Sequence, residues 1–87
     1  LETHKRKFVV DFKGPKMKKD IADGKITAEV SASEGRIVGQ YLMYNPLIKG
    51  ATVYMDFEPN NKTSELRIVL KKDGKNISEV WSYQWLP

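Results

Sequence analysis

Apolar and polar residues alternate in several short segments of the chain, and turn residues separate these segments. The clearest segment is 25–32, where Ile26, Ala28, Val30 and Ala32 lie on one side and polar residues lie on the other. An alternation of period two is typical of a strand that buries one face and exposes the other. The pattern therefore predicts an all-β domain. Further segments with this alternation are 6–12, 51–58 and 66–71.

Four other segments need separate interpretation. Residues 36–44 are apolar on both faces, which is typical of a central strand rather than an edge strand. Residues 75–85 form the last predicted strand, and 47–49 are a candidate for a short seventh strand. Residues 17–24 are long enough for one helical turn, but their lysines and the Asp23-Gly24 pair favour a loop.

The turn at residues 73–74 predicts a hairpin, because Asp-Gly tolerates the positive φ that a tight turn requires. A two-residue turn would pair Lys72 with Lys75. A three-residue turn with a bulge would shift the pairing by one residue and place Arg67 opposite Glu79, a favourable charge pair. We therefore favour the bulged turn, with the two-residue turn as the alternative.

Strands spaced near ten residues apart, with no helical period, are typical of an immunoglobulin-like or fibronectin-like β-sandwich. We predict one such domain over residues 1–87, with six to seven antiparallel strands. The chain has no cysteine, so this sandwich has no disulfide. A small barrel of the same strands stays open, because periodicity defines the faces of strands and not their topology.

The net charge of +4 at pH 7 arises within residues 1–25, which hold eight Lys and Arg residues against four acids. No nucleic-acid-binding motif accompanies these lysines, so we expect no nucleic-acid partner and interpret residues 1–5 as a frayed linker. No apolar run is long enough to span a bilayer, so we expect no membrane insertion. The chain begins without Met and without a signal-peptide pattern, which predicts an excised fragment or a processed product.

Few residues suit catalysis. His4 is the only histidine and there is no cysteine, which argues against a histidine triad, a thiolate zinc site and a multi-His site, and we expect no metal or cofactor. Asp56 and Glu58 project from one strand face about 7 Å apart, a spacing that fits a glycosidase-type pair, although a solvated strand face is the favoured interpretation. We therefore expect this domain alone to have no enzymatic activity.

Three aromatic residues alternate on the last strand and therefore share one face: Trp81, Tyr83 and Trp85. Their rings suit stacking on sugars or on a partner protein, because a pyranose packs its C–H groups against an aromatic face. The favoured alternative is that they form part of the sandwich core. Weaker candidates for the same contact are Tyr41, Tyr44 and Tyr54.

Four segments carry a more specific signal: 6–14, 54–59, 70–75 and 78–85. Together they resemble the C-terminal domain of the periplasmic glucan biosynthesis family (MdoG/OpgG and OpgD type). The most specific part is the string Ser-Glu-Val-Trp-Ser-Tyr-Gln-Trp at 78–85. The resemblance covers nearly the whole chain from Arg6 onward.

The resemblance implies a periplasmic protein of a Gram-negative bacterium that works on the β-1,2-linked backbone of osmoregulated periplasmic glucans. It also implies that this domain follows a larger N-terminal β-sandwich domain with the glucan-handling cleft, so no catalytic residue can be assigned here. We expect a non-catalytic accessory domain that packs against that domain, with Trp81, Tyr83 and Trp85 in contact with it or with glucan. The alternative is a free-standing β-glucan-binding module.

Overall fold

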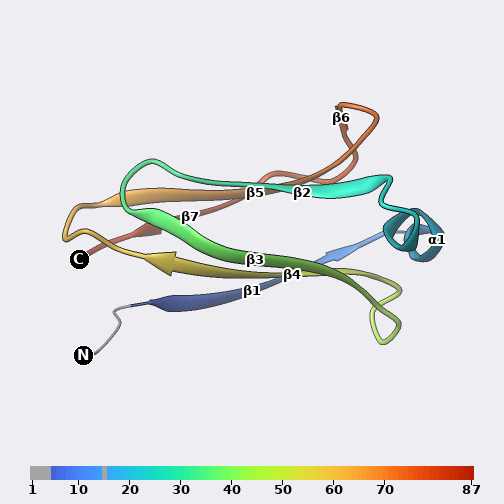
Figure 1. Cartoon of the computed structure of the whole chain (residues 1–87), viewed down its shortest axis with the longest axis horizontal. Coiled ribbons are helices and arrows are strands. Elements are labelled where there is room, and N and C mark those ends of the chain that lie inside the picture. The colour runs from blue at the N-terminus through green and yellow to red at the C-terminus, as the bar shows by residue number, and fades with distance from the viewer. Residues whose placement is uncertain (1–4, 15) are drawn as a thin grey trace.

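The computed structural model of the chain describes residues 5–14 and 16–87 and shows two stacked antiparallel sheets with a short helix at one end (Figure 1). The predicted all-β sandwich is confirmed. The predicted frayed linker at 1–5 lies, apart from Lys5, outside the described residues, as does His4. The elements in chain order are β1 (Arg6–Lys13), α1 (Met17–Ala22), β2 (Ile26–Ala32), β3 (Arg36–Asn45), β4 (Gly50–Glu58), β5 (Ser64–Lys72), β6 (Lys75–Asn76) and β7 (Trp81–Trp85).

Each sheet is built around one long central strand. The first sheet has the order β1-β4-β3, so β4 has a neighbour on both edges. In the second sheet β5 pairs with β2 along one edge and with β6 and β7 along the other. The alternating residues of both central strands point between the sheets and form the core, as their periodicity predicts. The fully buried ones are Ala51, Val53, Met55, Phe57, Leu66, Ile68 and Leu70.

The position of β3 differs from the prediction. It pairs only with β4, so it is an edge strand of the first sheet and not a central one. Its pattern is apolar on both faces because Tyr41 points to the outer face of the sheet. No other element covers this side chain, which remains 64% exposed among the described residues. An apolar outer face therefore produced the same pattern that a covered strand would produce. The candidate seventh strand at 47–49 is also wrong, because these residues belong to the turn that joins β3 to β4.

A helix replaces the loop that was predicted after β1. Met17 and Ile21 are four residues apart, so one helical face brings both against the end of the core. The N–H of Asp23 donates to the carbonyl oxygen of Lys19 at 2.8 Å, which closes the last turn. Burial of this apolar face outweighs the weak helix preference of so short a segment, because packing contributes most of the stability of short helices.

The hairpin between β5 and β6 has the two-residue turn, so the favoured bulged turn is wrong. Lys72 pairs with Lys75. Asp73 and Gly74 both have positive φ, 54° and 77°, the conformation that type I′ turns require. The predicted Arg67–Glu79 pair does not form, because Arg67 lies opposite Ser82.

The predicted last strand at 75–85 is interrupted at 77–80. Lys71 pairs with Asn76 and Ile68 pairs with Trp81, so two residues of β5 face four residues of the edge strand. The extra residues bulge outward. The hydroxyl oxygen of Ser78 accepts a 3.0 Å hydrogen bond from the N–H of Leu70, which keeps the central strand satisfied across the interruption.

Candidate functional site

β1 and β7 are edge strands of different sheets, and they flank the same side of the sandwich (Figure 1). Each pairs only with the central strand of its own sheet. The alternation along β7 turns its three aromatic side chains toward the inside, because their register partners on β5 are all buried. The pairs are Trp81 with Ile68, Tyr83 with Leu66, and Trp85 with Ser64.

Phe8 of β1 lies at the centre of an aromatic cluster that joins the two sheets. Its ring centroid is 6.0 Å from that of Trp81, 5.4 Å from that of Tyr83 and 6.5 Å from that of Trp85. Trp85 also meets Phe57 of the core edge to face at 5.9 Å. These contacts close the open side of the sandwich by side chains alone. We call the set Phe8, Trp81, Tyr83 and Trp85 the aromatic edge.

The aromatic edge is only partly closed to solvent. Trp81 and Trp85 are half-buried against the core, whereas Tyr83 stays 48% exposed. The rings of Trp81 and Tyr83 are nearly parallel, with 6° between their planes and 6.1 Å between their centroids. The sequence offered two interpretations of these residues, core and contact surface. In the structure the three β7 aromatic side chains point between the sheets, as core residues do, but Tyr83 also remains accessible to solvent.

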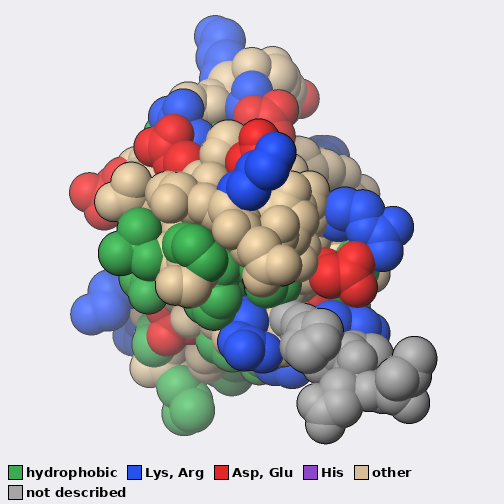
Figure 2. Space-filling view, turned by 90° about the vertical axis from the view of Figure 1, so that its left-hand side faces the viewer, with side chains coloured by type: hydrophobic (Ala, Val, Ile, Leu, Met, Phe, Trp, Pro, Cys, Tyr) green, Lys and Arg blue, Asp and Glu red, His purple; other side chains and the backbone are tan. Residues whose placement is uncertain are grey.

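Trp85 closes the aromatic edge at the end where β1 begins and β7 ends (Figure 1). The guanidinium carbon of Arg6 lies 5.7 Å from the centre of its ring, within the range of a cation–π interaction. The indole nitrogen of Trp85 is inaccessible and has no hydrogen-bond partner among the described residues. Viewed toward this end, the molecule shows hydrophobic side chains gathered on one side and charged side chains around them (Figure 2).

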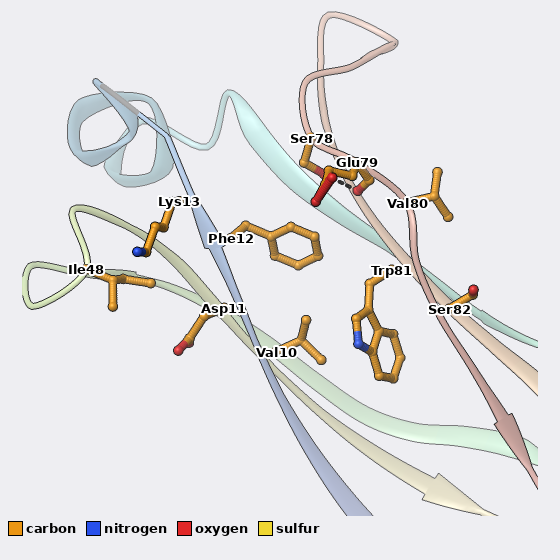
Figure 3. A pocket seen from close by; sticks show the side chains of 10 residues that line it. All are labelled: Val10, Asp11, Phe12, Lys13, Ile48, Ser78, Glu79, Val80, Trp81 and Ser82. Atoms are coloured by element: carbon orange, nitrogen blue, oxygen red, sulfur yellow. Dashed lines mark hydrogen bonds between the residues drawn. The ribbon is translucent and has the colours of Figure 1, made fainter.

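Beside the aromatic edge lies a hollow of about 720 Å³ between β1 and residues 78–82. Figure 3 shows Val10 and Phe12 of β1 and Trp81 of β7 directed into the space between the two strands, whereas Asp11 and Lys13 lie on the other side of β1. The hollow is thus walled mainly by apolar side chains. Its lining is Val10, Asp11, Phe12, Lys13, Ile48, Ser78, Glu79, Val80, Trp81 and Ser82.

The carboxylates Asp56 and Glu58 lie on the outer face of the first sheet, away from this hollow. Lys7 on β1 places its Nζ 3.1 Å from Oδ1 of Asp56. Arg36 on β3 donates a 3.0 Å hydrogen bond from Nε to Oε1 of Glu58. Each carboxylate therefore faces a cation from a neighbouring strand, as expected for a solvated sheet surface.

The three weaker tyrosine candidates are separated by the fold. Tyr41 and Tyr54 are register partners on the outer face, with centroids 6.4 Å apart. Tyr44 instead packs against the core. Sequence reasoning missed Phe8: its period placed it inward, but only the arrangement of the sheets brings β1 beside β7. No local signal could have found this contact.

Asp20 and Lys72 form an ion pair far from the aromatic edge, and the pKa values of both groups are shifted. Nζ of Lys72 donates a 2.7 Å hydrogen bond to Oδ2 of Asp20 on the helix. This hydrogen bond lowers the pKa of Asp20 and raises the pKa of Lys72. Within residues 5–14 and 16–87, no cluster of three His, Cys, Asp or Glu side chains could hold a metal ion, and no helix is long and apolar enough to cross a bilayer.

These features define a small all-β sandwich domain whose open side is closed by aromatic side chains. A family model described as "Periplasmic glucan biosynthesis protein, MdoG" matches residues 1–85. The chain therefore belongs to this family, which confirms the resemblance seen in its sequence, and it is involved in periplasmic glucan biosynthesis. The description of the family also implies a periplasmic location.

Proposed function

We propose that this chain is a non-catalytic accessory domain that packs against the glucan-handling domain of a periplasmic glucan biosynthesis protein. The observation that carries this proposal is the half-open aromatic edge. Tyr83 points inward between the sheets and is still 48% exposed, so a neighbouring surface can complete its burial. Large aromatic side chains that keep one polar end accessible are typical of protein interfaces.

We also infer that the sandwich is immunoglobulin-like. In the constant-type immunoglobulin fold, one sheet has the order A-B-E-D and the other contains C, F and G. If β1 is taken as strand B, the order β1-β4-β3 corresponds to B-E-D, and β5 with its neighbours β2 and β7 corresponds to F between C and G. The position of strand A is not filled by any strand of the described residues. Small accessory domains of secreted and cell-surface proteins often have this architecture.

The alternative proposal is a β-glucan-binding module. The parallel stack of Trp81 and Tyr83 favours it, because an exposed aromatic face can pack against the C–H groups of a sugar ring. The exposed Tyr41 on the outer face is a second possible platform.

A titration of the isotope-labelled chain with linear β-1,2-glucan oligosaccharides distinguishes the two functions. The indole N–H signals of Trp81 and Trp85 report on the aromatic edge. An accessory domain shows no shift at millimolar sugar. Saturable shifts at these two signals would overturn the accessory role in favour of the binding module.

A variant of the full-length protein tests domain packing directly. Tyr83→Ala should separate the thermal unfolding of the two domains into two transitions, because it removes the accessible part of the aromatic edge. Tyr41→Ala, an exposed tyrosine on the outer face, is the matched control and should leave unfolding unchanged. If Tyr83→Ala behaves like Tyr41→Ala, the aromatic edge does not contact the glucan-handling domain.

A further inference from the structure

One backbone edge of β1 has no neighbouring strand. The pairing of β1 with β4 runs without interruption from Arg6 opposite Phe57 to Lys13 opposite Gly50. Among the described residues, no strand pairs with its other edge. The eight residues of β1 extend over about 26 Å, at roughly 3.3 Å for each residue. An unpaired row of N–H and C=O groups of this length is a template for one more strand.

The hollow lies directly beside this edge. Val10 and Phe12 of β1 form one wall, and Trp81 of β7 forms the opposite wall (Figure 3). In an antiparallel or parallel sheet, every second side chain of an added strand would point to the inner face. Those side chains would enter the hollow of about 720 Å³ and cover the half-buried ring of Trp81. The backbone edge and the apolar space thus suit the same kind of occupant.

The bulge at 77–80 keeps this space open. It carries the side chain of Val80 to the outer face of the second sheet, beside Val69, where it is 41% exposed and does not fill the hollow (Figure 3). Ser78 supplies its hydroxyl to the N–H of Leu70 and also donates a 2.8 Å hydrogen bond to the carbonyl oxygen of Glu79. The N–H of Leu70 therefore has its hydrogen-bond acceptor within residues 77–80 and does not need one from β7. Bulges at sheet edges commonly end strand pairing and redirect side chains.

The added strand would occupy a position that the architecture already defines. In the immunoglobulin-like assignment made above, strand A pairs with strand B, which is β1. Of the seven strand positions in that assignment, this is the one that the described strands leave unfilled. The first sheet would then have four strands, and β4 and β1 would both be interior.

We propose that β1 accepts an extended segment of the glucan-handling domain as a fourth strand, with alternate apolar side chains of that segment filling the hollow. This proposal rests on the accessory role proposed above and names the contact surface. A second copy of this chain fits less well. If two β1 strands paired with Val10 opposite Val10, Lys7 of one would lie opposite Lys13 of the other, and directly opposed like charges destabilise a sheet. At the hollow the inner face of β1 presents Val10 and Phe12, and its outer face carries Lys7 and Lys13 against the single acid Asp11, which instead suits a segment that alternates apolar and acidic residues.

Hydrogen exchange in the full-length protein tests the proposal without any substitution. β3 is the other edge strand of the same sheet and serves as an internal control. About half of the amides of an edge strand point away from their neighbour and exchange readily, whereas those of an interior strand are nearly all protected. We expect the outward-facing amides of β1 to exchange at least about tenfold more slowly than those of β3. Equal exchange in the two strands would overturn the proposal.

A pair of matched variants then locates the occupant. Trp81→Ala removes the half-buried ring that lines the hollow opposite β1 and should raise the exchange of the outward-facing β1 amides to the level of β3. Trp85→Ala removes the other half-buried tryptophan of β7, which does not line the hollow, and should leave β1 protected. Loss of protection in both variants, or protection of β1 only after linear β-1,2-glucan is added, would contradict strand addition.

The outcomes separate this proposal from the accessory role on which it rests. If β1 exchanges like β3 while Tyr83→Ala still separates the two unfolding transitions, the domains pack together without strand addition. If β1 exchanges like β3 and Tyr83→Ala has no effect on unfolding, both proposals are wrong.

Discussion

Removing the ring of Phe8 should open the side of the sandwich where the two sheets are joined by side chains alone. Phe8→Ala deletes a ring that meets Trp81, Tyr83 and Trp85 at centroid distances of 5.4 to 6.5 Å. Truncation of a fully buried phenylalanine lowers the free energy of unfolding by about 3–5 kcal/mol. Phe8 is half-buried. We therefore expect a loss of about 2–3 kcal/mol, against a total stability of roughly 4–13 kcal/mol for a chain of this length.

Urea denaturation measures this loss. The two tryptophans of the chain are both in the aromatic edge, so their fluorescence reports on the region that the substitution changes. With a denaturant dependence of about 1 kcal/mol per molar urea, the midpoint should fall by roughly 2–3 M. Circular dichroism follows the strands as an independent probe, and the two transitions should coincide.

Val9→Ala is the matched control for this prediction. Val9 is the next residue on β1 but points to the outer face and is 55% exposed, so its truncation should change stability by less than about 0.5 kcal/mol. A double-mutant cycle between Phe8→Ala and Tyr83→Ala should give a coupling of about 0.5–1.5 kcal/mol. If Phe8→Ala costs no more than Val9→Ala, the aromatic edge does not hold the two sheets together.

Two further predictions concern the turn before β3 and the helix. Gly35 has φ of +78°, and a Cβ there would lie 2.5 Å from the carbonyl oxygen of Glu58, so Gly35→Ala should lower the free energy of unfolding by about 2 kcal/mol or more. Gly74 has a similar φ of +77° but open space around it, so Gly74→Ala should lower the free energy of unfolding by only about 1 kcal/mol. Equal losses for the two variants in urea denaturation would refute the steric argument. The hydrogen bond from Lys72 lowers the pKa of Asp20, so this carboxylate stabilises the fold fully above its unfolded pKa and progressively less as the pH falls through its lowered folded pKa. Asp20→Asn should therefore flatten the decline of the melting temperature below about pH 4, and an unchanged acid limb would contradict this assignment.

Prediction from the sequence succeeded where a strand has one clearly apolar face. The inner residues of β4, such as Val53 and Phe57, were identified from period two alone, because a residue's face is a local property of extended backbone. The same rule turned Trp81, Tyr83 and Trp85 to one face, and the structure agrees. The family could also be recognised from the sequence, because the resemblance lies in short runs of consecutive residues such as 78–85.

Prediction was wrong where the outcome depended on a competition between distant segments. β3 looked central because apolar residues, such as Tyr41 and Met43, also lie on its outer face, and only the assembled sheet shows that this face remains open. The helix after β1 forms because Met17 finds the end of the core, which the sequence of the segment does not reveal. The hairpin was expected to gain an Arg67–Glu79 pair, but an exposed ion pair is worth too little to select the register.

The sequence by itself therefore determined the all-β class, most of the strands, the inward face of each central strand and the family of this protein. Tertiary structure decided which strands lie side by side, and with that the meeting of Phe8 and the β7 aromatics and the hollow beside the free edge of β1. The physical reason is one of range. Alternation along a strand reflects steric geometry between adjacent residues, whereas strand order reflects the burial of whole faces against each other, summed over the entire core.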